Sequence, residues 1–238
     1  MEEKPFHFKQ FSIHQDNTAM KVGTDGVLLG AWSNIDESVN SILDIGSGTG
    51  LIALMMAQRS FAEVIDAVEI EDAAYVQCVE NFERSDWADR LFCYHTTFQE
   101  YSIEMDEKYD LIISNPPFYN STYKDLNKER ALARHSESLS YEELLTGISK
   151  LLSDNGSCAF IIPYSVEDFF IKIAIKKNLV LNKRTRVRGN ENSKIKRSLL
   201  QFSFREIEVE NEELIIEKER HLYTNEYKRL VKNFYLKM

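Results

Sequence analysis

The stretch Leu43-Asp44-Ile45-Gly46-Ser47-Gly48-Thr49-Gly50 decides the fold. The apolar run at residues 41–45 is typical of a buried strand, and residues 51–59 continue with the pattern of a helix. Three glycines between them allow the backbone to turn tightly and to come close to a ligand. The segment therefore predicts a strand, a ligand-binding loop and a helix in direct succession.

The same alternation runs outward from this segment over most of the chain. Further strands are predicted at 64–68, 91–95, 110–114, 156–162, 179–187 and 198–205, and helices at 71–85, 140–152, 165–177 and 225–236. Such alternation indicates an α/β protein with a mostly parallel, doubly wound sheet. No helix separates the last two strands, so we expect them to pair antiparallel at the sheet edge. Seven strands with one reversed favour a class I methyltransferase (Rossmann-like) fold over a dehydrogenase fold. The acid-rich residues 206–219 are expected to form a solvated surface stretch.

The glycine spacing indicates which ligand the loop accepts. Gly46, Gly48 and Gly50 follow the pattern G-x-G-x-G, whereas dinucleotide sites use G-x-G-x-x-G to aim a helix at a pyrophosphate. S-adenosylmethionine has no phosphate, so the tighter loop is sufficient. Asp44 can orient the loop or reach the ligand's ammonium through water. Glu69, at the end of the second strand, can accept hydrogen bonds from both ribose hydroxyls.

A second motif follows the fourth strand of this series directly. Residues 114–118 read Ser-Asn-Pro-Pro-Phe, and ligands of such sheets bind outside the carboxyl ends of the strands. The side-chain oxygen of Asn115 and the carbonyl of Pro116 can accept the two hydrogens of a planar, conjugated nitrogen. Pro116 and Pro117 lack an N–H and stiffen the turn. Phe118 offers a face for stacking on a base, which contributes roughly 1–3 kcal/mol. The motif predicts methylation of such a nitrogen.

Charge placement bears on the substrate. The chain has a net charge of −9, but residues 183–205 hold eight basic residues and one acid, Glu191. This segment could bind the phosphates of a nucleic acid, or its cations could lie on a solvated face of the protein without a partner. Candidate RNA contacts are Arg184, Arg186, Arg188, Lys194, Lys196 and Arg197, with Lys124, Arg130 and Arg134 after the second motif.

Several classes of protein are disfavoured by composition. No apolar run is long enough to span a membrane and no leader precedes the domain, so we expect a soluble, cytoplasmic protein. Cys78, Cys93 and Cys158 lack the spacing of a zinc site and are expected to be reduced thiols, with no metal bound. We expect a single domain over residues 1–238 and a monomer.

Beyond these motifs, the chain resembles the bacterial tRNA-Val (adenine-N6)-methyltransferases, which modify adenine 37 beside the anticodon. The resemblance spans nearly the whole chain, and residues 19–32 are its most specific segment. It also includes residues 8–11, the two motifs, residues 66–69, Arg130, Arg134 and residues 233–236. The resemblance implies S-adenosylmethionine as cofactor, the anticodon loop of tRNA as partner, and methylation of adenine N6 as reaction.

The resemblance also assigns residues to the cofactor. It implies that Gly23, Thr24 and Asp25 lie over the methionine end, so that residues 1–32 form an N-terminal extension contributing to the site. Two departures from the family pattern are visible. Many relatives carry Tyr at the position of Phe118, and relatives often carry an acid near the cofactor adenine where this chain offers Thr97.

Three other functions compete with this one. A guanine-N2 methyltransferase of ribosomal RNA and a glutamine-N5 methyltransferase of proteins both act on planar conjugated nitrogens, so the Asn-Pro-Pro-Phe motif does not separate them from an adenine enzyme. A module that binds the cofactor without catalysis is disfavoured by the intact motif. The opening segment and the basic residues 183–205 favour tRNA adenine.

Overall fold

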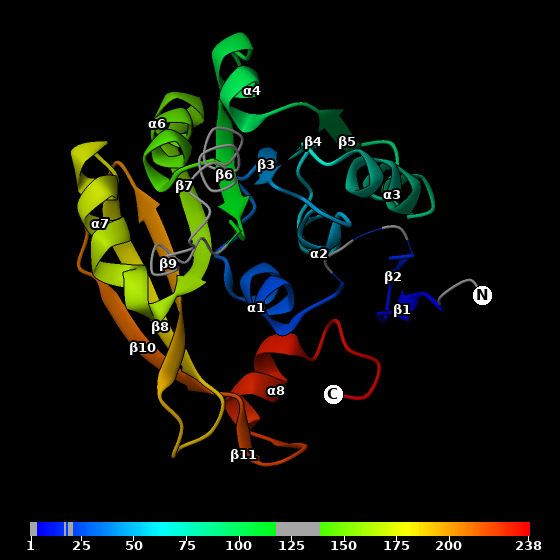
Figure 1. Cartoon of the computed structure of the whole chain (residues 1–238), viewed down its shortest axis with the longest axis vertical. Helices are drawn as coiled ribbons and strands as arrows, with labels where there is room; N and C mark the ends of the chain where they lie inside the picture. The colour runs from blue at the N-terminus through cyan, green and yellow to red at the C-terminus, as the bar shows by residue number, and fades with distance from the viewer. Residues whose placement is uncertain (1–3, 17, 19–20, 118–138) are drawn as a thin grey trace, which may run out of the picture.

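The computed structural model describes residues 4–16, 18, 21–117 and 139–238. Its centre is an eight-stranded sheet with the order β10-β8-β9-β7-β6-β3-β4-β5 (Figure 1). All neighbouring strands pair in parallel except β9, which runs antiparallel to both β7 and β8. The strands are β3 (Ser41–Ile45), β4 (Val64–Glu69), β5 (Leu91–His95), β6 (Tyr109–Ser114), β7 (Leu152–Pro163), β8 (Val180–Arg188), β9 (Ile195–Ser203) and β10 (Glu210–Ile215).

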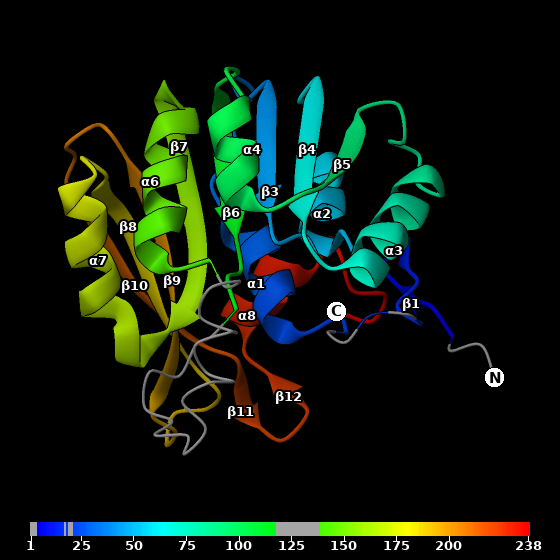
Figure 2. The same cartoon turned by 45° about the horizontal axis from the view of Figure 1, so that its top comes forward.

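Helices cover both faces of this sheet (Figures 1 and 2). One face carries α1 (Thr24–Trp32), α2 (Leu51–Arg59), α3 (Asp72–Glu83) and α8 (Asn225–Val231), and the other α4 (Phe98–Glu104), α6 (Tyr141–Leu151) and α7 (Glu167–Lys176). Side chains of a strand point alternately to the two faces. On β6, Leu111 and Ile113 accordingly join the first apolar cluster and Ile112 the second. The layered, mostly parallel sheet confirms the predicted fold class.

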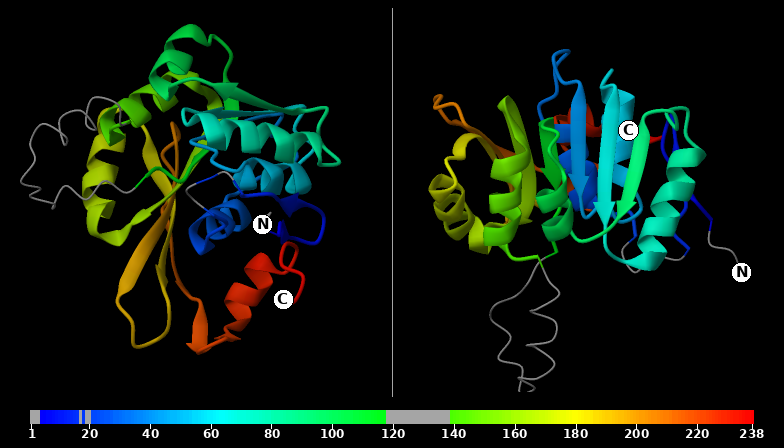
Figure 3. Two further views of the ribbon diagram at one scale, coloured as in Figure 1. Left: turned by 45° about the vertical axis from the view of Figure 1, so that its right-hand side comes forward. Right: turned by 90° about the horizontal axis from the view of Figure 1, so that it is seen from above.

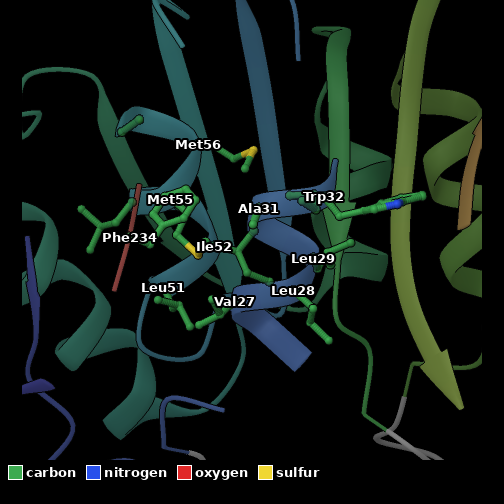
Figure 4. Packing of buried hydrophobic residues seen from close by; sticks show 14 of the residues in the cluster. Val27, Leu28, Leu29, Ala31, Trp32, Leu51, Ile52, Met55, Met56 and Phe234 are labelled. Atoms are coloured by element: carbon green, nitrogen blue, oxygen red, sulfur yellow. The ribbon is translucent and has the colours of Figure 1, made fainter. Parts of the chain in front are cut away.

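The first helix layer packs closely around two helices. In Figure 4, Val27 of α1 lies beside Leu51 of α2, and Ala31 of α1 faces Ile52 of α2. Gly30 faces Met55 so closely that a Cβ there would lie 2.6 Å from the sulfur, so its missing side chain lets the two helices approach. Near the start of α1, a Cβ on Gly26 would lie 3.1 Å from Leu51, the first residue of α2, so this end of α1 lies beside the glycine loop.

Helix starts agree with the local signals in the sequence. Ser140 caps α6, and its hydroxyl and the Glu143 carboxylate form the reciprocal hydrogen bonds of a capping box. The helix predicted over 71–85 is shorter, at Asp72–Glu83, and the last helix ends at Val231 rather than at residue 236. Asn178 follows α7 with a φ of 62°, a left-handed conformation that terminates the helix.

Most of residues 206–219 are exposed, as expected, but part of this stretch is a strand that the sequence pattern did not predict. Residues Glu210–Ile215 form β10, which pairs in parallel with β8 and becomes the edge of the sheet. Its acids form ion pairs with Lys183 and Arg188 of β8, and Leu214 is buried. The sheet thus has eight strands, and the reversed strand β9 lies two places inside the edge.

The two ends of the chain meet beside α1. Strands β1 (Phe6–His7) and β2 (Ser12–Ile13) form a small hairpin, and Phe8 bridges to Tyr235. The Lys9 amide donates to the Phe234 carbonyl at 2.8 Å. A second hairpin, β11 (Glu217–Glu219) and β12 (Leu222–Tyr223), leads into α8; Figure 3 shows this C-terminal part and the N-terminal strand on the same side of the molecule.

Candidate cofactor and substrate site

The glycine loop joins β3 to α2 through three left-handed residues. Gly46, Gly48 and Gly50 have φ values of 71°, 56° and 79°. Residues other than glycine rarely adopt this left-handed backbone conformation. A Cβ on Gly46 or Gly48 would meet nothing within 4 Å, whereas one on Gly50 would lie 2.6 Å from the Phe82 ring. The first two glycines therefore leave open space for a ligand, and the third lets the loop pack against α3.

Glu69 ends β4 directly beside this loop. Its carboxylate accepts hydrogen bonds from the amide of Gly48 at 2.8 Å and from the amides of Ile70 and Glu71, both at 2.9 Å. The side chain is 7% exposed. These bonds hold a buried carboxylate at the wall of the cavity, in the position that the sequence pattern predicted for it.

Asp44 lies beneath the loop rather than in the cavity. One carboxylate oxygen accepts the Ala53 amide of α2 at 3.1 Å, and the other has no hydrogen-bond partner among the described residues. Burial raises the pKa of Asp44 to about 7, against the Ala53 hydrogen bond and with a smaller contribution from the charge of Glu69. Asp44 therefore anchors α2 to the loop; its approach to a ligand ammonium stays a prediction.

A cavity of about 790 Å³ opens at the carboxyl ends of β3, β4 and β6. Most predicted site residues line it together, from the N-terminal segment, the loop, β4 and the second motif: Gly23, Thr24, Asp25, Gly46, Gly48, Glu69, Thr97, Asn115, Pro116 and Pro117. Asp44 and Gly50 support the loop without lining the cavity. Among the further lining residues, Thr18, Phe98 and Leu139 were not predicted as site residues from the sequence.

The second motif closes one side of the cavity. Ser114, the last residue of β6, donates its hydroxyl to the Ile45 carbonyl at 2.9 Å, which ties the ends of β6 and β3 together. Asn115, Pro116 and Pro117 then follow in the cavity wall. Four predicted residues lie outside the described residues: Phe118, Lys124, Arg130 and Arg134.

Thr97 lines the cavity as the cap of α4. Its hydroxyl accepts the Glu100 amide at 3.1 Å and donates to the Glu100 carboxylate at 2.8 Å. Both functions of the hydroxyl are thus used within the helix start. Its contact with a cofactor adenine stays a prediction.

Most cations of the basic segment are paired inside the protein. The buried Glu167 carboxylate accepts Arg184 at 3.0 Å and Arg186 at 2.6 Å. Although burial of Glu167 acts to raise its pKa, hydrogen bonds from Arg186 and Ser198 outweigh it, and the pKa is lowered. These arginines therefore hold α7 against β8.

Two further arginines of the segment are also paired, while two lysines are exposed. Arg188 meets Glu213 of β10 at 2.7 Å, and Arg197 meets Asp25 at 2.8 Å. The second pair connects β9 to the wall of the cavity. Lys194 and Lys196, near the turn between β8 and β9, make no ion pair within the described part of the chain. Of the segment's predicted contacts, these two lysines are the most accessible to phosphate.

Metal-binding clusters and membrane spans are both missing from residues 4–16, 18, 21–117 and 139–238. Over those ranges, no group of three or more His, Cys, Asp or Glu side chains is placed to hold a metal ion. No helix in the same ranges is long and apolar enough to cross a membrane.

Sequence comparison places the chain among known proteins. Residues 23–146 match the family described as methyltransferase small domain. The chain is 58% identical to the tRNA1(Val) (adenine(37)-N6)-methyltransferase of Christiangramia forsetii, with 100% of both chains covered. It is 54% identical to the protein of the same name from Flavobacterium psychrophilum, with 98% of this chain and 100% of the relative covered.

Structural comparison supports the fold. A predicted O-methyltransferase from Agrobacterium tumefaciens matches with a TM-score of 0.68 at 18% identity, over 88% of this chain and 96% of its own. TYW2 of Pyrococcus horikoshii, solved in complex with MeSAdo, matches with a TM-score of 0.58 at 12% identity, over 83% of this chain and 69% of its own. The full-length sequence matches are closer, and by them the chain belongs to the tRNA1(Val) (adenine(37)-N6)-methyltransferase family, S-adenosylmethionine-dependent enzymes with a methyltransferase small domain.

Proposed function

We propose that this protein transfers a methyl group from S-adenosylmethionine to N6 of adenine 37 in tRNA-Val. One observation carries the proposal: a single cavity joins the glycine loop and Glu69 to Asn115 and Pro116. The names of relatives that match over the full chain supply the substrate. We propose further that the protein acts as a monomer in the cytoplasm and that residues 1–238 form one domain.

The residues present fit the cofactor. Gly46 and Gly48 leave open space in the loop, and a buried carboxylate on Glu69 faces the same cavity, suited to a pair of hydroxyls. Gly23, Thr24 and Asp25 close the opposite side, where the methionine end is proposed to bind. When bound, the cofactor supplies an electrophilic methyl group on a sulfonium.

Asn115 and Pro116 are proposed to bind the target amino group. The Asn115 side-chain oxygen and the Pro116 carbonyl each accept one N–H, which favours a nitrogen whose lone pair points toward the methyl group. Neither proline can donate a backbone hydrogen bond to that carbonyl. Because the proton leaves after the nitrogen has become cationic, no strong base is needed, and positioning contributes most of the rate.

Incubation of the purified protein with unmodified tRNA and labelled cofactor, followed by nucleoside analysis, tests the proposal. We expect N6-methyladenosine at position 37. Asn115→Ala should lower kcat by about a hundredfold or more and leave cofactor affinity unchanged, because the lost acceptor acts mainly in the transition state. N2-methylguanosine, a methylated protein glutamine, or full activity of Asn115→Ala would each contradict the proposal.

RNA binding completes the proposal. Lys194 and Lys196 are expected to contact the tRNA stem, and Lys124, Arg130 and Arg134 to place the target nucleotide beside Phe118. The paired residues Arg184, Arg186, Arg188 and Arg197 already bind internal carboxylates, so fewer of their N–H groups remain for a phosphate. We therefore expect the two lysines to contribute more of the salt-dependent affinity.

A further inference from the structure

A second cavity of about 570 Å³ lies where the two ends of the chain meet. We call it the tyrosine cavity. Its lining includes Phe6, His7, Tyr223, Tyr227, Tyr235 and Lys237. Thr24, at the start of α1, lines both this cavity and the one that holds the predicted methyl-transfer site. The two cavities therefore meet at the same turn of α1.

The aromatic walls of the tyrosine cavity are fixed by the fold. Tyr223 and Tyr227 have ring centroids 5.2 Å apart and planes inclined by 35°, and Phe6 and Tyr235 are 6.2 Å apart. Tyr227 is buried, while Tyr223 and Tyr235 are half-buried and present ring surface. The Thr224 hydroxyl accepts the Tyr227 amide at 3.2 Å, which fixes the start of α8. The cavity thus offers preformed aromatic faces, which bind with little loss of side-chain entropy.

The elements around this cavity are rich in cations. Seven exposed basic residues on β1, β11, α8 and their flanking turns make no ion pair within residues 4–16, 18, 21–117 and 139–238: Lys4, Lys9, Lys218, Arg220, Lys228, Lys232 and Lys237. Acids on the same elements are fewer: Glu217 lines the cavity, Glu219 is exposed, and Glu226 pairs with Arg229. In an acidic protein, this is an accessible concentration of positive charge.

We propose that the tyrosine cavity binds a nucleobase of the tRNA other than the methylated adenine, with the neighbouring phosphates on the surrounding lysines. The inference rests on the proposed function and adds a second nucleotide site to it. Aromatic faces beside cations fit an unstacked base and its backbone, since proteins recognise single-stranded loops by such stacking. The shared Thr24 means that this base would lie beside the wall of the cavity that holds the predicted methyl-transfer site. Holding it would keep the loop open while the adenine leaves its stack.

Tyr223 provides the main test. Tyr223→Ala removes a stacking face and should raise the Kd for an anticodon stem-loop and the KM for tRNA by between about fivefold and about a hundredfold. The kcat at saturating tRNA and the affinity for S-adenosylmethionine should remain at wild-type values, because the residue binds substrate and transition state equally. Tyr223→Phe keeps the ring and should restore the KM. Phe169→Ala, on α7, removes another exposed aromatic and serves as the matched control.

A charge-reversal variant tests the cations independently of the aromatic wall. Lys218→Glu combined with Lys237→Glu should weaken stem-loop binding and reduce its salt slope by about 0.7–0.9 for each phosphate that the protein no longer neutralises. Lys172→Glu, on α7, is the matched control. Wild-type Kd and salt slope in both the Tyr223→Ala and the double-lysine variants would overturn the inference.

The two proposals fail in different ways. If the wild-type protein leaves tRNA adenine unmethylated, the proposed function fails, and direct titration with the labelled stem-loop still decides whether the tyrosine cavity binds RNA. If the wild-type protein methylates adenine 37 and the cavity variants bind and react normally, only the second nucleotide site is refuted.

Discussion

The free energy of unfolding of the cofactor-free protein should decrease as the pH rises toward neutrality, because Asp44 is buried. Its pKa is about 7 in the folded protein against an ordinary value of 3.8. Between these values the folded protein holds a proton that the unfolded chain has released, so stability falls with increasing pH over this window. Integrating the linkage relation from pH 5 to pH 8 gives a loss of roughly 2–3 kcal/mol from this one carboxyl group.

Asp44→Asn should abolish that loss. The amide keeps an oxygen for the Ala53 N–H, and its NH₂ adds a cost of about 1–3 kcal/mol that does not change with pH. Urea unfolding at a series of pH values should therefore show the variant gaining roughly 2–3 kcal/mol on the wild type between pH 5 and pH 8. Asp154→Asn replaces an exposed acid of β7 and supplies the baseline. A difference between Asp44→Asn and wild type that is constant over this range would refute the reasoning.

Three further predictions concern the loop, its carboxylate and the RNA contacts. Glu69→Ala should weaken cofactor binding by roughly tenfold to a hundredfold, measured by calorimetry, because a charged acceptor is lost; unchanged affinity would contradict the site. Gly50→Ala should destabilise the fold by about 1–3 kcal/mol in urea, because the new Cβ would lie 2.6 Å from the Phe82 ring at a φ of 79°; wild-type stability would show that the loop can relax. Lys194→Glu combined with Lys196→Glu should reduce the slope of log affinity for tRNA against log salt concentration by about 1.4 or more. An unaltered slope would show that these lysines do not contact tRNA phosphates.

The sequence predicted the core of the fold well because each element there carries its own signal. The helix over 51–59 has the predicted ends, and the helix predicted over 140–152 begins directly after its cap, Ser140. The glycine loop and the Asn-Pro-Pro turn also meet in one cavity, since both follow strands that are parallel neighbours. Local pattern and parallel pairing are sufficient for these features.

The edge of the sheet was not predictable in the same way. Strand β10 reads Glu-Asn-Glu-Glu-Leu-Ile, which has little strand character by itself. It is a strand because its acids form ion pairs with Lys183 and Arg188 on β8. From the sequence, the basic residues of that segment were predicted to bind RNA phosphates or to lie on an exposed face. The partner of a charge lies far away in the sequence, so local patterning could not separate a phosphate contact from an internal ion pair. The tyrosine cavity depends on such distant pairing too, since Phe6 and Tyr235 meet only in the folded chain.

The meeting of the two chain ends also sets an order of assembly. The Phe8–Tyr235 bridge joins two residues that lie far apart in the sequence, and β10 can pair only after β8 has taken its place beside β9. Contacts of such long sequence separation form late in folding. A nascent chain should therefore build the central strands and the glycine loop first, and the β1–β2 hairpin should dock through Phe8 only after residue 235 has emerged. The tyrosine cavity would be completed only at that point, because Tyr223, Tyr227 and Tyr235 all line it.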